Sequence, residues 1–400
     1  MAVTPHPRLG YTMVDADHHY YEPYDCFTRH IEAKYADQAV HHVEAEDGIR
    51  RTYIGDHPFA WRPFAVADVM GAPGASKGQV AKNPTMKSGE AMATIDPKEH
   101  PAFMNRDARI KELDSQGVEA CVMLPTEAVI VEHELYPFGP EVAFANIRSF
   151  NRWLEEDWGY DYQDRIFGVP ILSLADIDLA VAELERVLEA GARIVHLQPG
   201  PVAYGRSPAD PEFDPFWARV QEAEIPVVYH IGNANYNELI GVHWGLPAHP
   251  CIYDATPFAQ LLGLSTRPIS DTLAALVLGD LFGRFPRLKV LSVENGSSWV
   301  GSLLDEMDHA TKLSRISWSS RPGKPSEIFK EHVYIAPFWE DSGTDLAGII
   351  GADHVLMGSD YPHSEGEDDP VNFVDCVAGL SERDTWLVMH QNVAGLLRIA

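Results

Sequence analysis

The stretch IFGVPILSLADIDLAVAELERVLEAGARIVHLQPG, residues 166–200, carries the pattern that decides the fold. Apolar runs at 166–172 and 192–197 have the length of buried strands, and 177–190 between them has the spacing of an amphipathic helix. Gly191 directly follows this helix, and glycine readily adopts the left-handed conformation that ends many helices. The stretch therefore predicts a strand–helix–strand unit with two parallel, buried strands.

The same alternation extends over the whole chain. We expect further strands at 11–19, 118–124, 226–230, 289–293, 332–335 and 354–357, and further helices at 106–116, 141–158, 213–222, 269–285 and, after Asp369 and Pro370, up to residue 378. Eight strands alternating with helices predict an α/β fold, the (β/α)8 TIM barrel, in a single domain over residues 1–400. A doubly wound open sheet is the alternative, but no Gly-x-Gly-x-x-Gly motif follows the first strand.

Two long insertions interrupt this alternation. The first, 23–105, follows the first strand and contains a hairpin around 50–54 and a tract rich in Gly, Ala, Lys and Ser at 71–89. The second, 233–267, follows the fifth strand. Long insertions on a compact fold usually form lids, binding loops or oligomer contacts, so we expect a lid or a homodimer contact here.

The composition restricts the class of partner. The chain has 31 basic and 59 acidic residues and a net charge of -28, which argues against binding to nucleic acid or to an anionic membrane. No apolar run approaches the roughly 20 residues of a membrane span, and residues 1–10 lack the apolar core of a signal peptide. We therefore expect a cytoplasmic enzyme that acts on a small molecule. The four scattered cysteines, Cys26, Cys121, Cys251 and Cys376, indicate no disulfide.

Polar residues gather at the ends of the predicted strands. Asp17 and His19 are two positions apart, so in an extended strand both side chains point the same way. His230 ends the fifth strand and Asp360 follows the eighth. Barrel enzymes place their sites at the carboxyl ends of the strands, and imidazole and carboxylate groups together suit a divalent metal ion. The pattern predicts a metal centre, although each residue alone also fits a cap, a surface position or a hydrogen-bonded core site.

Several motifs, taken together, resemble the amidohydrolase-related family that includes aminocarboxymuconate-semialdehyde decarboxylase. The resemblance runs from about residue 11 to the C-terminus and is weakest in the first insertion. It rests on Asp15-x-Asp17-x-His19-x-x-Glu22-Pro23, Pro125-Thr126, 151–154, 226–230, 284–290, 358–363 and Asn392.

This resemblance implies one catalytic divalent metal, zinc first and manganese second. The implied ligands are Asp17, His19, His230 and Asp360, and Asp360 would also accept a proton from metal-bound water or hold the metal during decarboxylation. A bound divalent cation lowers the pKa of its water from near 16 to roughly 7 and so makes hydroxide available at neutral pH.

The sequence departs from the family pattern at one important position. Several decarboxylases of this family have a histidine near the end of the sixth strand, where this chain has Glu294. A carboxyl group there can act as an acid or a base if burial raises its pKa, and the alternative is that it pairs with a buried arginine and only orients loops. We also assign His363 to catalysis. His18 is expected to be structural, and Glu22, His196, His243 and Trp244 are weaker candidates for the site.

These features favour a metal-dependent hydrolase that directs metal-activated water at an amide, ester, lactone or imine carbon. The alternative is a nonoxidative, metal-dependent decarboxylase of an aromatic or unsaturated carboxylic acid. A binding protein with a decayed site is disfavoured because all four implied ligands are present. A nicotinamide-dependent reductase is disfavoured because no phosphate-binding loop is found.

Overall fold

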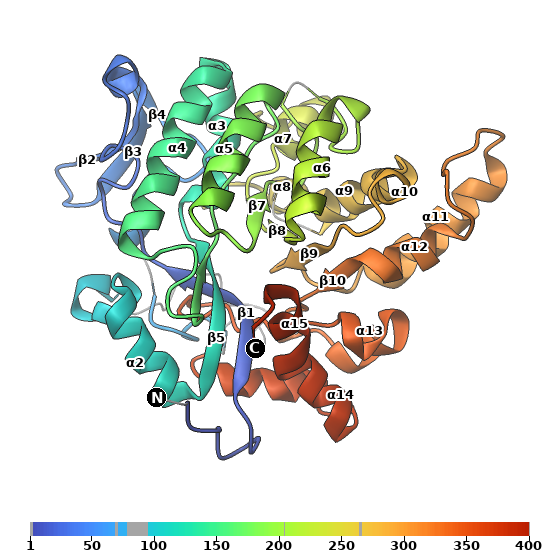
Figure 1. The fold of residues 1–400 in the computed structure, drawn as a ribbon. Helices are drawn as coiled ribbons and strands as arrows, with labels where there is room; N and C mark the ends of the chain where they lie inside the picture. The colour runs from blue at the N-terminus through green and yellow to red at the C-terminus, as the bar shows by residue number, and fades with distance from the viewer. Residues whose placement is uncertain (1–2, 69–70, 78–94, 204, 264–265, 400) are drawn as a thin grey trace.

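A ring of parallel strands surrounded by helices forms the body of the protein (Figure 1). The structure is a computed structural model that describes residues 3–68, 71–77, 95–203, 205–263 and 266–399. The regular strands of the ring are β1 (Met13–Tyr20), β5 (Val118–Pro125), β6 (Ile166–Gly168), β7 (Val195–Leu197), β8 (Val227–His230), β9 (Val290–Val293) and β10 (Val333–Ile335).

Single bridges close this ring. The strands β1, β5 and β6 pair in one sheet, and β7, β8, β9 and β10 pair in another. A parallel bridge between Ile171 and His196 joins β6 to β7, and another between Ile335 and Val355 joins β10 to the segment 355–357. The backbone N–H of Ala16 then donates to the carbonyl of Met357 at 2.9 Å and completes the circle at β1. The predicted α/β barrel is confirmed.

The prediction of an eighth strand at 354–357 is wrong in detail. His354 belongs to a 3-10 helix, Ala352–His354, and the segment after it is extended but pairs through isolated hydrogen bonds. The N–H of Leu356 donates to Ile335 at 2.8 Å on one side, and Met357 accepts from Ala16 on the other. Three residues, 355–357, lie between the 3-10 helix and Gly358, so this segment is too short for a longer ladder of hydrogen bonds with its neighbours.

Apolar side chains fill the inside of the barrel. They come from alternate positions of the strands and are almost fully buried: Val14, Ala120, Val122, Phe167, Ile194, Val228, Leu291 and Leu356. Alternation along parallel strands places every second residue inside the barrel and the others under the surrounding helices. The barrel is therefore a packed core whose polar residues lie at the strand ends.

A register shift in β1 directs the side chains of Asp17 and His19 toward the inside of the barrel. Between the pairs Asp15–Cys121 and His18–Met123, β1 advances three residues while β5 advances two, which is a β-bulge. Regular alternation from the interior residue Ala16 would place His18 inside the barrel. The extra residue reverses the alternation, so Asp17 and His19 face the interior instead.

The helices cover the outside of the ring and broadly match the predicted ranges. They are α2 (Arg106–Gln116), α3 (Glu132–Leu135), α4 (Pro140–Asp157), α5 (Ile177–Glu189), α6 (Asp214–Ala223), α7 (Tyr236–Leu239), α8 (Pro257–Gly263), α9 (Arg267–Leu278), α10 (Leu281–Arg284), α11 (Val300–Leu313), α12 (Pro325–His332), α13 (Gly343–Ile350), α14 (Glu382–Trp386) and α15 (Asn392–Leu397). The predicted helix 269–285 divides into α9 and α10 because Asp280 adopts a left-handed conformation with φ of 58°. Asp369 caps its helix as expected, accepting from the N–H of Val371, but Pro370–Val377 is a 3-10 helix.

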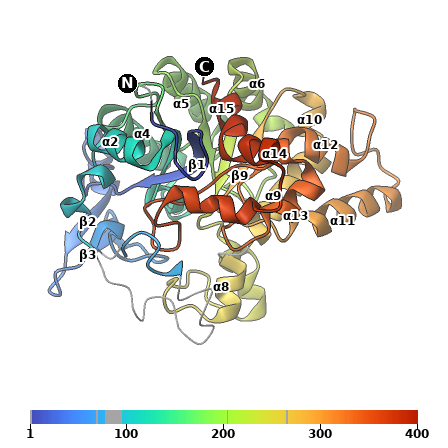
Figure 2. The ribbon, with the colours of Figure 1, turned by 90° about the horizontal axis from the view of Figure 1, so that it is seen from below.

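The two insertions contact each other. The first contains an antiparallel sheet of β2 (Val40–Glu44), β3 (Arg50–Ile54) and β4 (His57–Pro58), which confirms the predicted hairpin. The N–H of Ile252 donates to Trp61 at 2.8 Å, and the rings of Phe64 and Tyr253 stack with centroids 4.9 Å apart. Figure 2 shows α8 and the β2–β3 hairpin along the same edge of the molecule. Most of the tract 71–89 lies outside the described residues.

Two further expectations concern cysteines and membranes. All four cysteines are free, as predicted. One stretch of the described chain, Pro257–Leu278, is long and apolar enough for a membrane span, with a mean hydropathy of 1.2. The sequence prediction overlooked this stretch. It includes α8 and α9 and is 50% buried in the fold, as core helices of soluble proteins also are, so it is weak evidence for a membrane.

Candidate metal centre

The four predicted ligands meet at the carboxyl end of the barrel. Asp17 and His19 lie in β1, His230 is the last residue of β8, and Asp360 follows the eighth strand segment. Their exposed fractions are between 0% and 7%. Because parallel strands all end on the same side of the barrel, residues distant in sequence share one buried space.

The ligand atoms are close enough to share one ion. His19 Nε2 lies 3.1 Å from Asp17 Oδ1 and 3.4 Å from Asp360 Oδ1. His230 Nε2 lies 3.6 Å from Asp17 Oδ1. Two atoms bound to one ion at about 2.1 Å are separated by about 3 to 3.5 Å, so these spacings fit a common divalent ion.

Glu294 also belongs to this cluster. Its Oε2 atom lies 2.8 Å from His230 Nε2 and 3.9 Å from His19 Nε2. Ligand atoms of Asp17, His19, His230 and Glu294 all lie within 4.8 Å of one another, and a second such group contains His19, Glu294, Asp360 and His363. Glu294 is in both groups, whereas Asp360 is only in the second. No buried arginine pairs with Glu294 among the described residues, so the alternative of a loop-orienting ion pair is not supported.

The backbone at both carboxyl-bearing strand ends is strained. Glu294 has φ of 55° and Asp360 has φ of 56°, in the left-handed region that non-glycine residues rarely adopt. Such conformations cost about 1–3 kcal/mol each and persist where the surrounding structure requires them. Here they turn two carboxyl groups into the mouth of the barrel.

Three carboxyl groups in one buried space repel each other. Burial, and then the charges of Glu294 and Asp17, raise the pKa of Asp360 well above its usual range. Burial likewise raises the pKa of Glu294 to about 7, against the opposing effect of His230. Burial alone would raise the pKa of Asp17, but the hydrogen bond from His19 and the charges of His19 and His230 outweigh it and lower the pKa of Asp17. A bound cation would therefore stabilise this cluster of carboxyl groups.

His230 is oriented as a metal ligand. Its Nδ1–H donates to the carbonyl of Ile231 at 2.8 Å, which leaves the Nε2 lone pair directed into the cluster. Nε2 has no partner with hydrogen-bond geometry among the described residues, although the Glu294 oxygen is nearby. Burial alone would lower the pKa of His230, but the carboxylates of Glu294 and Asp17 raise it to about 10. A proton or a metal cation is needed here, and this mixed nitrogen and oxygen donor set fits a divalent metal.

His363 lies against Asp360. His363 Nδ1 lies 2.6 Å from Asp360 Oδ1, and its Nε2 lies 3.0 Å from the hydroxyl of Thr126. The His363 ring also stacks on His19 with centroids 4.0 Å apart. Burial, and then the charge of His19, lowers the pKa of His363. The predicted catalytic residues Asp360 and His363 thus form a buried pair beside the ligands.

Glu22 fixes the loop that carries Thr126. One Glu22 oxygen accepts the backbone N–H groups of Thr126, Glu127 and Ala128 at 3.0, 2.8 and 3.2 Å. Burial, and then the charge of Glu127, raises the pKa of Glu22 to about 7. Glu22 therefore supports the site without belonging to either metal-binding group.

The remaining sequence candidates have different environments. His18 is structural, as expected: its Nε2 lies 3.1 Å from Asp15, and its Nδ1 lies 3.2 Å from the Arg109 guanidinium. His196 is buried close to His230, and burial lowers its pKa to about 3, but it joins neither metal-binding group. His243 and Trp244 are exposed, with Trp244 70% accessible, and neither belongs to the metal-binding groups of the described residues.

Sequence reasoning missed two supporting residues. Asp15 accepts from the N–H groups of Asp17 and Ser359 at 3.0 and 3.1 Å, and so ties β1 to the segment that bears Asp360. Thr126 positions His363. Both lie in motifs that carry the family resemblance, and this resemblance was the one signal that could have identified them. The residues that they contact, Ser359 and His363, are distant in sequence.

Comparison with known proteins identifies the family. The amidohydrolase family model matches residues 14–399, which include every predicted ligand. The chain belongs to the amidohydrolase family. A solved amidohydrolase from Mycobacterium avium subsp. paratuberculosis K-10 is 37% identical, with a TM-score of 0.88, over 97% of this chain and 100% of that one.

Two further relatives are decarboxylases. A gamma-resorcylate decarboxylase from Rhodococcus jostii RHA1 is 26% identical over 315 residues, which are 74% of this chain and 88% of the relative. A dihydroxybenzoic acid decarboxylase from Polaromonas sp. JS666, solved with manganese and 2-nitroresorcinol, shares the fold at 19% identity with a TM-score of 0.59. The match covers 81% of this chain and 93% of the Polaromonas chain. The protein is a metal-dependent enzyme of the amidohydrolase superfamily.

Proposed function

We propose that this protein is a metal-dependent, nonoxidative decarboxylase of an aromatic carboxylic acid. The observation that carries the proposal is the buried carboxyl group of Asp360, which lies 2.6 Å from His363 and whose pKa is raised mainly by burial. Nonoxidative decarboxylation replaces a carboxylate on carbon with a proton, so it needs an acid beside the substrate. Hydrolysis instead needs a base that removes a proton from water.

Charge balance divides the roles of the three carboxyl groups. A buried divalent ion is neutralised by two carboxylates, and a third carboxyl group beside it is better accommodated with its proton. We assign Asp17 and Glu294 to the metal with His19 and His230, because ligand atoms of these four lie within 4.8 Å of one another, and Asp360 is not in this group. Asp360, at 2.6 Å from His363, is then the proton donor. The sequence prediction instead made Asp360 a fourth ligand and Glu294 an acid or base.

The proposed step is balanced in atoms and charge. Asp360 gives its proton to the ring carbon that bears the carboxylate, the bond from that carbon to the carboxylate breaks, and its electron pair returns to the ring. Carbon dioxide leaves, and Asp360 regains a proton from solvent with its carboxyl group held by His363. A bound divalent cation would fix the oxygen atoms of the substrate and stabilise negative charge on them.

We further propose manganese as the resident metal, in place of the zinc that the sequence put first. The Polaromonas decarboxylase was solved with manganese. The proposed ligand set of two imidazole and two carboxylate groups is a mixture of nitrogen and oxygen donors that accommodates manganese. A small-molecule substrate, a homodimer, a cytoplasmic location and the absence of nucleic-acid or membrane partners remain proposals that rest on the sequence.

The test compares Asp360→Asn with wild type. Manganese-loaded enzyme is incubated with 2,6-dihydroxybenzoate, other hydroxybenzoates and 5-carboxyvanillate in deuterated water, and carbon dioxide and ring deuterium are measured. We expect one deuterium per product from wild type. Asp360→Asn should lose this activity yet keep its metal by elemental mass spectrometry, and the exposed control Asp305→Asn should behave as wild type. Turnover of amide, ester or lactone substrates without carbon dioxide release from any acid would overturn the proposal.

A further inference from the structure

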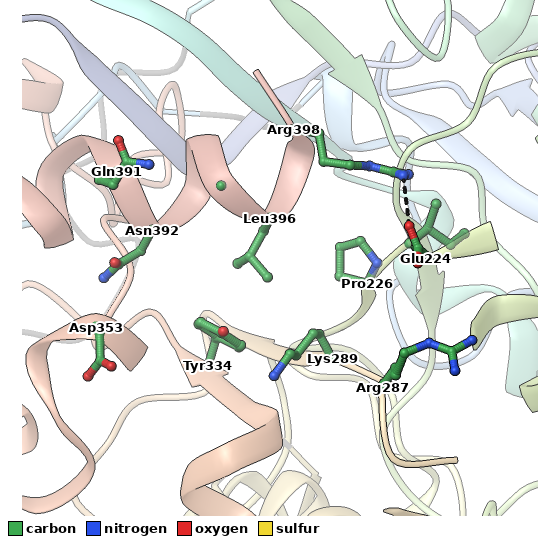
Figure 3. A pocket seen from close by; sticks show the side chains of 12 residues that line it. Glu224, Pro226, Arg287, Lys289, Tyr334, Asp353, Gln391, Asn392, Leu396 and Arg398 are labelled. Atoms are coloured by element: carbon green, nitrogen blue, oxygen red, sulfur yellow. Dashed lines mark ion pairs between the residues drawn. The ribbon is translucent and has the colours of Figure 1, made fainter. Parts of the chain in front are cut away.

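A second cavity lies at the opposite end of the barrel from the metal ligands. It has a volume of about 400 Å³ and lies where β8, β9 and β10 begin, against α15 (Figure 3). Pro226 precedes β8, Lys289 precedes β9 and Tyr334 lies in β10, whereas His230 and Glu294 are at the far ends of β8 and β9. Nothing in the proposed reaction uses this cavity.

Basic side chains gather around this cavity although the protein has a net charge of -28. Arg287, Lys289 and Arg398 line it. The Arg287 guanidinium has no ion pair or hydrogen bond with any described residue. Lys289 donates to the backbone carbonyl of Glu331 at 2.8 Å but has no carboxylate partner, and burial lowers its pKa. Two cations of the cavity are therefore not neutralised by the protein.

The carboxylates of the cavity leave one excess positive charge. Glu224 lies 3.5 Å from the Arg398 guanidinium and pairs with it. Asp353 makes no ion pair with the described residues, and Figure 3 shows it on the opposite side of the cavity from Arg287 and Arg398. Three cations against two carboxylates favour a ligand with a single negative charge, directed toward Arg287 and away from Asp353.

Apolar groups form the rest of the wall. Ile225, Pro226, Leu396 and the ring of Tyr334 line the cavity, and Figure 3 shows Pro226, Leu396 and Tyr334 around its centre next to Lys289. A bare inorganic anion would leave this surface in contact with water. An anion with an apolar body would bury it, and small-molecule sites commonly combine an apolar wall with a few oriented polar groups.

We propose that this cavity binds a small amphipathic monocarboxylate, with its carboxylate on Arg287 and its apolar body against Pro226, Leu396 and Tyr334. Arginine forms paired, charge-assisted hydrogen bonds with carboxylates, which gives Arg287 the largest share of the recognition. The site is separate from the metal centre and does not depend on which reaction the metal centre performs.

The test uses benzoate as the probe and isothermal titration of the metal-loaded enzyme. Arg287→Gln removes one exposed, unpaired charge, and Arg315→Gln makes the same change at an exposed position elsewhere. We expect Arg287→Gln to weaken one benzoate-binding phase at least about tenfold, and Arg315→Gln to leave it unchanged. Benzamide, which is uncharged, and inorganic phosphate, which lacks an apolar body, should bind at least about tenfold more weakly than benzoate at this phase.

Three results would overturn the proposal. Equal benzoate affinity in wild type and Arg287→Gln would place all benzoate binding elsewhere, including at the metal centre. Phosphate binding as tight as that of benzoate would remove the role of the apolar wall. Benzamide binding as tight as that of benzoate would remove the role of the charge.

Discussion

The two ends of the barrel are built for different purposes. Toward the amino-terminal end, interior positions carry apolar side chains such as Ala120, Val228 and Leu291, in regular strands. At the carboxyl end, the interior positions carry Asp17, His19 and His230, with a bulge in β1 and left-handed backbone at the neighbouring carboxyl residues. Stability comes from the first region, and the second is strained and charged because it is shaped for binding and chemistry.

The charges also differ between the ends. Carboxyl groups converge at the metal centre, and basic groups converge at the cavity on the opposite face. Each cluster is incompletely neutralised by its own protein groups, so each favours a ligand of opposite charge. Variants at one end should therefore leave the other end unchanged, and this independence can be measured.

The largest effect should follow from removal of His230. His230→Ala removes a nitrogen ligand at the centre of the cluster, and turnover should fall on the order of a thousandfold or more as the metal is lost. Metal content by elemental mass spectrometry and activity would be measured together. His196→Gln is the matched control, because His196 is buried close by but belongs to neither metal-binding group. Full metal content in His230→Ala would remove His230 from the ligand set.

A change in the apolar interior should affect stability alone. Ile194→Ala creates a cavity at a fully buried position, which should lower the free energy of unfolding by about 2–5 kcal/mol. Denaturant unfolding would measure the change, and metal content should equal that of wild type. Loss of metal in this folded variant would show that the two ends are coupled and would contradict the comparison.

A smaller effect is expected at Glu294. Glu294→Gln keeps the size of the side chain but removes its charge, and metal affinity should fall about 10- to 100-fold in competition with a chelator, because a charged ligand is lost. Glu306→Gln, at an exposed position of α11, is the control. Unchanged metal affinity in Glu294→Gln would return Glu294 to the acid or base role predicted from the sequence.

The smallest effect, taken per pH unit, should be the dependence of metal binding on pH. The pKa of His230 is raised to about 10, so at neutral pH the metal must displace a proton from its imidazole. Binding releases that proton, and affinity should therefore rise by about tenfold per pH unit above pH 7. Below pH 7 the rise should be steeper, because the pKa of Glu294 is raised to about 7 and Glu294 must also lose its proton. Chelator competition between pH 6 and pH 8.5 would measure both slopes, and an affinity independent of pH would contradict this proton balance.

The sequence predicts the barrel and the four-residue constellation because both depend on short-range patterns. Apolar runs, a helix end at Gly191 and polar residues at strand ends can be recognised without knowledge of distant contacts. The pairing of Asp360 with His363 is also local, since three positions separate them.

Other features depend on contacts between distant segments. The bulge in β1 is visible only when its register with β5 is known, although it decides which residues face the metal. The closeness of Glu294 to His230 requires β8 and β9 to be neighbours, and the short pairing of 355–357 depends on both flanking strands. The cavity at the other end assembles Arg287, Lys289 and Arg398 from separate elements, so no sequence motif reports it.

Crystals of manganese-loaded protein, measured by anomalous diffraction at the manganese edge, test the central claim most directly. The account predicts one peak at the carboxyl end of the barrel, about 2.0–2.2 Å from atoms of Asp17, His19, His230 and Glu294. Asp360 should lie beside the ion with its carboxyl group on His363. A strong peak bound elsewhere, or no peak in crystals of protein that contains manganese, would contradict it.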